Sequence, residues 1–206
     1  MDIHISVRNL VEFILRSGDI DNRKAVAPEN AMQEGSRIHR MIQRRMGSDY
    51  HAEDSLQYLY ETENYRILID GRADGIIDAT ESTGNRVTID EIKGTYREIH
   101  RIKEAQQVHL AQASCYAYFY AKQQELSAIR IRITYCNMET EELKYFHYEY
   151  TIRELENWFM EIINSYRRWA DFQYEWQGLR QQSIKQLVFP FPYREGQKNL
   201  VTYVYQ

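Results

Sequence analysis

The sequence has 206 residues, of which 43% are hydrophobic and 27% charged, and it contains three prolines. This length and composition are typical of a globular protein with a single core, so a disordered or fibrous chain is excluded. The net charge of −4 argues against a protein that is basic overall, but a local basic groove can lie on an acidic body.

The two cysteines, Cys115 and Cys136, are too few for a disulfide framework or a cysteine-rich zinc site. We expect both to pack in the core, and we expect no iron–sulfur cluster, because such a cluster takes four thiolates. No apolar run approaches the ~20 residues that cross a bilayer, and the N-terminus has no signal-peptide pattern. The sequence therefore predicts a cytoplasmic protein without a membrane partner.

The first predicted element is a helix over 7–16, which Ser6 caps and Gly18 ends. A second helix is predicted over 30–46, where apolar residues recur at helical spacing. A turn over 80–85 joins the last two of the strands that follow. Three strands are predicted here, at 56–61, 66–78 and 86–93.

The second half of the chain begins with a predicted helix over 103–123. A strand over 128–136 and its hairpin partner over 143–150 come next. Thr151 and Glu154 then form the pattern of a capping box, which opens a long helix to about residue 177. Helices before, between and after strands predict an α/β fold with a central mixed β-sheet flanked by helices.

The strand over 86–93 carries charged residues at positions where its pattern predicts buried ones. Its period of two places Glu91 and Lys93 on the same side as Ile89, and Asp90 on the opposite side. Charged side chains on a core-facing strand are costly unless they are paired or bound to a metal. This cost makes Glu91 and Lys93 candidate functional residues.

A symmetric hairpin that turns at Ser82 and Thr83 sets Asp74 directly opposite Glu91. Opposed residues have Cβ atoms about 4.5–5.5 Å apart, so two carboxylates there repel unless a cation lies between them. This pairing predicts a divalent metal, and a site with two carboxylates and few other ligands suits Mg²⁺. Lys93 would then orient a water or stabilise negative charge during phosphodiester hydrolysis.

These residues resemble a known nuclease family. Asp74 followed by Glu91-Ile92-Lys93 resembles the motif of the PD-(D/E)XK nucleases. Three further motifs resemble those of the RecB-like members, in the family's order, over about residues 5–150. They are Gly35 with His39, Gly71 to Asp74, and Gln112 with Tyr116.

The resemblance implies a restriction-endonuclease-like core and a metal-dependent DNA nuclease that uses Mg²⁺ or Mn²⁺. It makes Asp74, Glu91 and Lys93 the catalytic residues, and it adds His39 and the carbonyl of Ile92 to the two carboxylates as metal ligands. An imidazole ligand shifts the preference toward Mn²⁺. The helical pair of Gln112 and Tyr116, four residues apart on one face, would support Lys93 or hold DNA.

The tail changes character at about Ser183. Phe191 to Gln197 resembles the segment that opens the ATPase core of DinG- and XPD-type DNA helicases, some of which carry a RecB-like domain in front. The resemblance implies a nuclease domain over 1–182, and a linker with the start of a truncated helicase domain over 183–206. It also implies an exonuclease on single-stranded or tailed DNA, as the front domain of a DNA repair helicase.

Basic residues near the candidate site in sequence form two clusters, one on the second helix and one after Lys93. Most charge clusters are solvated surfaces, but backbone contacts dominate nucleic-acid affinity, so we predict a groove that tracks phosphates. The residues expected to bind DNA there are Arg37, Arg40, Arg44, Arg97 and Arg101.

Each candidate residue also has a purely structural interpretation. His39 beside an apolar stripe can be a core histidine, Asp74 can cap a turn, and Glu91 with Lys93 can be an ordinary ion pair on a half-exposed strand. At the level of function, the alternatives to an active nuclease are three. They are a catalytically weak or inactive nuclease fold that serves as a DNA clamp, a hydrolase of sugar- or nucleotide-linked substrates, and an interaction domain with coincidental motifs.

Overall fold

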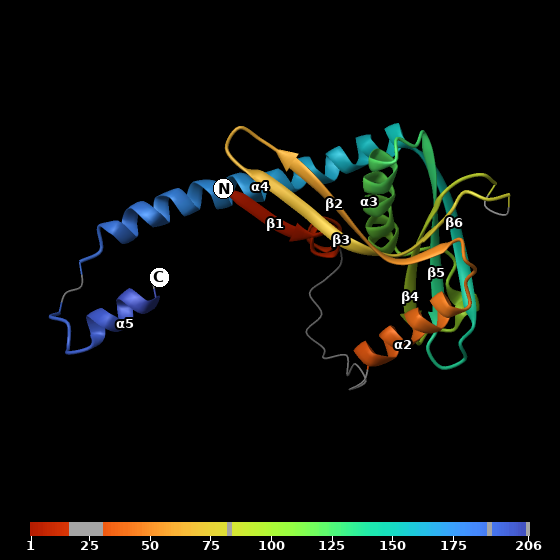
Figure 1. Ribbon diagram of the computed structural model, residues 1–206, viewed down its shortest axis with the longest axis horizontal. Coiled ribbons are helices and arrows are strands. Elements are labelled where there is room, and N and C mark those ends of the chain that lie inside the picture. Colours follow the sequence, from red (N-terminus) through yellow and green to blue (C-terminus); the bar gives the residue numbers. More distant parts are fainter. Residues whose placement is uncertain (17–30, 82–83, 189–190, 205–206) are drawn as a thin grey trace. The chain divides into compact units, whose positions relative to one another are not determined.

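The computed structural model describes residues 1–16, 31–81, 84–188 and 191–204. The chain divides into two compact units, Met1–Arg168 and Trp169–Gln206. The first unit contains a six-stranded sheet with helices against it (Figure 1). The second unit contains the later part of one long helix and one short helix.

The strands of the sheet lie in the order β1-β3-β4-β5-β6, with β2 paired to β3 off this path. The pairs β1–β3 and β4–β5 are parallel, and the other three are antiparallel, so the predicted mixed sheet is confirmed. The strands are β1 (Asp2–Ser6), β2 (Tyr50–Glu61), β3 (Arg66–Ile77), β4 (Thr88–Thr95), β5 (Ala128–Asn137) and β6 (Leu143–Thr151).

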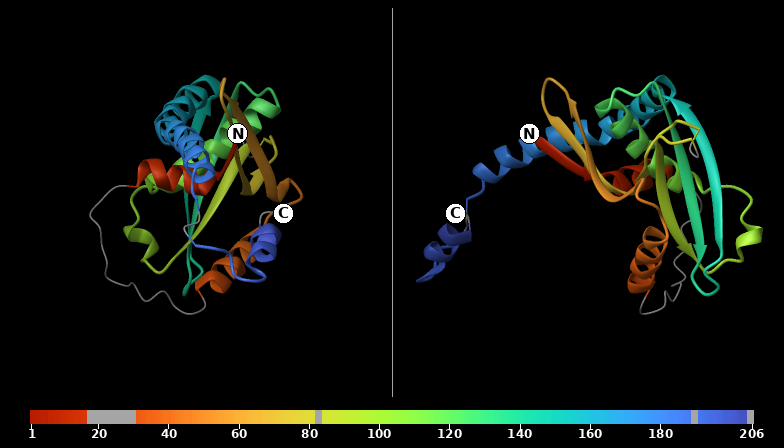
Figure 2. Two further views of the ribbon diagram at one scale, coloured as in Figure 1. Left: turned by 90° about the vertical axis from the view of Figure 1, so that its left-hand side faces the viewer. Right: turned by 45° about the vertical axis from the view of Figure 1, so that its right-hand side comes forward.

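The helices cover both faces of this sheet, as the views in Figures 1 and 2 show. On one face α2 packs Ile38 and Ile42 against Ile92 of β4 and Cys136 of β5. On the other face α3 contacts β4 and β5, and α1 packs on α3. The helices are α1 (Val7–Leu15), α2 (Ala31–Arg44), α3 (Gln107–Gln123), α4 (Ile152–Lys185) and α5 (Gln197–Val204), with a short 3-10 helix at Ile99–Arg101.

Several local predictions are confirmed by specific contacts. Ser6 caps α1, since its side chain accepts a hydrogen bond from the Asn9 N–H at 3.2 Å. Thr151 and Glu154 form the reciprocal capping box at the start of α4, with N···O distances of 2.8 and 3.3 Å. Both cysteines are buried and free. The structure thus has the predicted α/β fold with flanking helices, an arrangement consistent with a restriction-endonuclease-like core.

Some element bounds differ from the prediction. β1 was not predicted, because the alternation of Ile3 and Ile5 with polar residues extends over only five positions. β2 begins at Tyr50, and α4 continues to Lys185, so the predicted boundary after residue 182 falls inside a helix. The predicted helix end at Gly18 and the hairpin turn at 82–83 lie outside the described residues.

The pairing of β3 changes along one of its edges. Arg66 to Asp70 pair with β1, and Gly75 to Ile77 pair with β4, so residues 71–74 lie where the edge passes from one partner to the other. The β3–β4 pairs are Gly75 with Asp90, Ile76 with Ile89 and Ile77 with Thr88. The three pairs follow the predicted register, but the ladder ends one pair short of the predicted direct opposition of Asp74 and Glu91.

β4 is buried on both faces, which alternation alone did not indicate. Ile89, Asp90, Glu91 and Ile92 are all fully buried, as expected for a central strand with a parallel neighbour and helices on either side. Asp90 points away from Glu91 as predicted, but it is a buried charge as well. Its partners are Arg132 at 2.7 and 2.9 Å, Thr134 at 2.6 Å and Tyr50 at 3.1 Å.

The second unit has few buried side chains. Trp169, Phe172 and Trp176 follow one face of α4, with ring centroids 5.4 and 6.4 Å apart in sequence order. None of the described residues of α5 is buried. Among the described residues, no helix combines the length and the apolar character needed to cross a bilayer.

The buried Asp90–Arg132 pair yields a stability prediction. Arg132→Met should lower the free energy of unfolding by about 3–5 kcal/mol, because it leaves the Asp90 carboxylate buried beside two neutral donors. Asp90→Asn combined with Arg132→Met should recover part of the loss, since no charge then remains. Urea unfolding followed by circular dichroism measures both, and a loss under ~1 kcal/mol for Arg132→Met would contradict a structural role for the pair.

Candidate active site

The candidate site lies where β3 separates from β4. Past the Gly75–Asp90 pair, the Ile92 N–H donates a hydrogen bond to Oδ2 of Asp74 at 2.7 Å. A side-chain acceptor thus satisfies a main-chain donor of β4. The position of the Asp74 carboxylate therefore follows from the separation of the two strands.

The main chain of Asp74 is held from α2 and β2. Its carbonyl oxygen accepts hydrogen bonds from Gln43 at 3.1 Å and from the Tyr50 hydroxyl at 3.4 Å. A Cβ at the next residue, Gly75, would lie 1.9 Å from the Tyr50 hydroxyl oxygen, so only glycine lets the tyrosine approach the strand this closely. Tyr50 is thereby fixed between Asp74 and Asp90.

His39 reaches the same carboxylate from α2. Its Nδ1 lies 3.3 Å from Oδ1 of Asp74, and both side chains are largely shielded. Burial opposes a charge on His39, but the hydrogen bond and the charge of Asp74 outweigh it and raise the pKa of the imidazole above its ordinary value. The structure therefore brings the two predicted metal ligands together as a hydrogen-bonded pair.

Glu91 lies fully buried beside Lys93. Its Oε1 is 2.6 Å from Lys93 Nζ, but neither carboxylate oxygen accepts a hydrogen bond of good geometry from the described residues. Burial and then the charge of Asp74 raise the pKa of Glu91 above its ordinary value, while Lys93 acts in the opposite direction. A half-exposed surface ion pair, one of the structural interpretations, does not describe this carboxylate.

α3 contributes the remaining predicted residues. Lys93 Nζ donates to Oε1 of Gln112 at 3.2 Å, and Gln112 in turn hydrogen-bonds Tyr116. Tyr116 lies against β3 at Gly71, where a Cβ would be 2.6 Å from the hydroxyl oxygen. The glycine of one predicted motif thus makes room for the tyrosine of another.

The donor chemistry of this cluster fits a divalent cation. Both oxygens of Glu91 are buried without a hydrogen-bond donor among the described residues, and burial and then the charge of Asp74 raise its pKa. An imidazole with two carboxylates suits Mg²⁺ or Mn²⁺. As the side chains lie, however, no three His, Cys, Asp or Glu residues in the described part of the chain converge in a metal-binding arrangement. Asp74 contacts His39, and Glu91 contacts Lys93.

The basic residues have different surroundings. Arg37 pairs with Glu34 at 3.0 Å and with Glu141 at 2.9 Å, so its charge is compensated and it ties α2 to the β5–β6 turn. Arg40 and Arg44 are exposed on α2. Arg97 and Arg101 border a cavity of about 860 Å³ that begins at Gly94, directly after Lys93.

Sequence reasoning missed His109 and Tyr135 next to the site. His109 Nδ1 lies 2.8 Å from the Tyr135 hydroxyl, which also accepts a hydrogen bond from the Gln106 N–H at 3.0 Å. His109 precedes Gln112 by three residues, so its helical spacing could have indicated it. Tyr135 could not be found this way, because it faces Lys93 only through the parallel pairing of β4 with β5.

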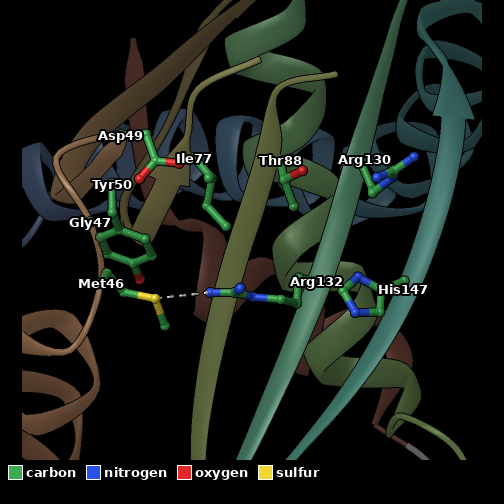
Figure 3. Close-up of a pocket in the computed structure, with 9 residues that line it drawn as sticks. All are labelled: Met46, Gly47, Asp49, Tyr50, Ile77, Thr88, Arg130, Arg132 and His147. Atoms are coloured by element: carbon green, nitrogen blue, oxygen red, sulfur yellow. Dashed lines mark hydrogen bonds between the residues drawn. The ribbon is translucent and has the colours of Figure 1, made fainter. Parts of the chain in front are cut away.

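A separate cavity of about 230 Å³ lies near Asp90. Figure 3 shows the Arg132 side chain extending toward Met46 and Tyr50, with the His147 ring on the neighbouring strand. None of the predicted catalytic or metal-binding residues lines this cavity. It belongs to the surroundings of the structural Asp90 pair.

Comparison with protein-family profiles and with characterised proteins finds no match to this sequence. The fold is similar to a solved structure described as "Crystal structure of SSO0001", with a TM-score of 0.50 and 15% sequence identity. The similarity covers 78% of this chain and 74% of that one. At this level of identity the similarity shows a shared fold and nothing about activity.

The contact between Gly71 and Tyr116 predicts a coupled effect on stability. Gly71→Ala should cost about 1–3 kcal/mol in the native background, because the new methyl overlaps the tyrosine. In a Tyr116→Ala background the same substitution should cost less by more than ~0.5 kcal/mol. Urea unfolding of the four proteins measures this difference, and additive costs would show that the overlap is relieved elsewhere.

His109 predicts a pH dependence of stability. Burial and then the charges of Lys93 and Arg8 lower its pKa from 6.5 to about 4. As the pH falls, His109 is therefore protonated in the unfolded chain before it is protonated in the folded one. The contribution of His109 to stability is present above pH 6.5 and is lost as the pH falls toward 4. His109→Gln should lose less stability over this range, by on the order of 2 kcal/mol. Urea unfolding at pH 7 and pH 4.5 with EDTA tests this, and equal losses would rule it out.

Proposed function

We propose that this chain is a metal-dependent DNA nuclease that hydrolyses phosphodiester bonds. The observation that carries the proposal is the arrangement of Asp74 and Glu91 where β3 separates from β4, with Lys93 beside the buried Glu91. Buried carboxylates in an ordinary protein core accept hydrogen bonds. Glu91 has a raised pKa, and neither of its oxygens has a hydrogen-bond donor among the described residues. Such groups cluster at functional sites.

The residues take the following roles. Asp74, Glu91, His39 and the carbonyl of Ile92 would hold Mg²⁺ or Mn²⁺. When bound, such an ion supplies an activated water and neutralises charge on the phosphate. Each of these residues comes from β3, β4 or α2, which are fixed to one another by the Gln43, Tyr50 and Ile92 contacts.

Lys93 acts at the reacting phosphate. Gln112 and Glu91 hold its ammonium group from two sides, which limits the rotamers of a long and flexible side chain. From this position it orients the attacking water or stabilises the negative charge that develops on the phosphate. The water oxygen forms the new bond to phosphorus, and the opposite ester oxygen leaves with a proton as an alcohol.

The substrate and the context of the site are also proposals. We infer an exonuclease on single-stranded or tailed DNA, acting in the cytoplasm as the front domain of a DNA repair helicase in the same chain. The support is the resemblance of the tail from Phe191 to Gln197 to a helicase start. In the structure this segment belongs to the second unit and leads into α5.

A DNA clamp with slow or absent cleavage is the second candidate function. The observation in its favour is that the predicted ligands do not converge as a group of three among the described residues: His39 and Asp74 contact each other, and Glu91 contacts Lys93. In a clamp these contacts would be permanent, and the ion pair of Lys93 would serve folding alone.

Cleavage of end-labelled DNA tests the proposal. The chain should cut single-stranded DNA with Mg²⁺ or Mn²⁺ and not with EDTA. Lys93→Ala and Asp74→Ala should each reduce the rate by about 10²–10⁴-fold, because each removes a group that acts on the reacting phosphate or its metal.

Matched controls separate chemistry from folding. Lys122→Ala removes an exposed lysine of α3 that pairs with Glu156, and Asp70→Ala removes an exposed carboxylate of β3 that pairs with His4. Both should keep the native rate. DNA binding without metal-dependent cleavage would favour the clamp, and cleavage that survives in both site variants would overturn the assignment of the residues.

A further inference from the structure

A large cavity lies next to the candidate site, and its lining includes Gly94, the residue after Lys93, and Tyr135, which pairs with Lys93 in the sheet. It has a volume of about 860 Å³ and runs from the end of β4 past the 3-10 helix to the first turn of α3. We call it the β4–α3 cavity; its polar and charged lining includes Arg97, Glu98, Arg101, Lys103, Glu104 and His109. This volume falls within the range of about 300–1,000 Å³ that is usual for small-molecule sites.

The cations of the β4–α3 cavity are not balanced by its carboxylates. Glu98 lies 2.5 Å from Arg101 and 3.3 Å from His100, so its charge is already committed. Neither Arg97 nor Lys103 has an ion pair with any described residue. Glu104, on the same lining, is the one remaining carboxylate there. The exposed part of this lining is therefore suited to an anionic group such as a phosphate.

The less exposed part of the lining is uncharged, and it includes the apolar side chains of Ile102 and Ala105. His109 and Tyr135 lie there in contact with each other, and burial with the nearby cations keeps the imidazole neutral at neutral pH. Tyr135 is almost fully buried, and its hydroxyl is fixed by the Gln106 N–H. Neutral hydrogen-bonding groups and aromatic rings suit a nucleoside better than a second anion.

We propose that the β4–α3 cavity binds one unpaired nucleotide of the DNA strand, adjacent to the phosphodiester held at Lys93. The inference deepens the proposed function and rests on it for the position of that phosphodiester. Arg97 and Lys103 contact the phosphate of the bound nucleotide, and His109 and Tyr135 face its sugar or base. A base that is paired and stacked in a duplex cannot enter a walled cavity, so the strand must be single here.

Binding measured in EDTA tests the proposal without cleavage. The fluorescence anisotropy of a labelled 15-residue oligothymidylate and of a matched blunt duplex is titrated with the full chain. We expect the single strand to bind at least about tenfold more tightly. Arg97→Gln and Lys103→Gln should each weaken single-strand binding about three- to tenfold, and should each lower the salt slope by about 0.7, because each removes one phosphate contact.

Two variants serve as matched controls. Arg153→Gln makes the same charge change at an exposed position of α4 and should leave both the affinity and the salt slope unchanged. Glu104→Gln removes the carboxylate from the cavity lining and should tighten binding. Equal effects of Arg97→Gln and Arg153→Gln would show a general charge effect and would overturn the proposal.

Two further measurements identify the ligand class and the place. Thymidine monophosphate should compete with the oligonucleotide at much lower concentration than inorganic phosphate, and equal competition would reduce the cavity to an anion site. Photocrosslinking with a 4-thiothymidine oligonucleotide should label residues 94–109, and labelling elsewhere alone would refute the cavity as the site.

The outcome is separable from that of the nuclease assay. If the chain cleaves DNA but the cavity variants bind single strands as tightly as the native chain does, the nuclease proposal stands and the cavity proposal is refuted. Nucleotide binding in the cavity without metal-dependent cleavage would end the nuclease proposal and leave the cavity as the nucleotide site of a clamp.

Discussion

The hydrogen bond from the Ile92 N–H to the Asp74 carboxylate is the contact on which the site depends. It forms because β3 leaves β4 after the Gly75–Asp90 pair, which frees a main-chain donor that must find another acceptor. The Asp74 carboxylate thereby takes the place of a main-chain acceptor on a neighbouring strand, and its other oxygen faces His39. Residues from α2, β3, β4 and α3 meet only because the sheet opens at this point.

β4 carries two neighbouring buried carboxylates that differ in their hydrogen-bond partners. Asp90 has a guanidinium, two hydroxyls and a short distance to each, so its charge is compensated within the fold. Glu91 is equally buried, but it has one lysine and no well-formed hydrogen bond from the described residues. The missing donors, rather than burial itself, distinguish the chemically available carboxylate from the structural one.

Local patterns in the sequence predicted much of this geometry. Alternation placed Glu91 and Lys93 on one side of β4, hairpin symmetry gave the β3–β4 register, and capping residues placed the starts of α1 and α4. The hydrogen bonds of Gln43 and Tyr50 to the Asp74 carbonyl were beyond reach, because each joins residues more than twenty positions apart. Alternation does not predict the burial of Asp90, because it assumes a strand that is covered on one face only.

The partners of Asp90 also protect the alignment of β4 during folding. A slip of one residue would turn every side chain of the strand to the opposite face. Arg132 and Thr134 of β5 would then face an apolar neighbour instead of a carboxylate, and Lys93 would be driven in among Ile38 and Ile42. A misaligned chain would therefore lose the Asp90–Arg132 ion pair on one face and bury Lys93 among apolar side chains. The ion pair on one face of the sheet thus favours the register that positions Glu91 and Lys93 on the other face.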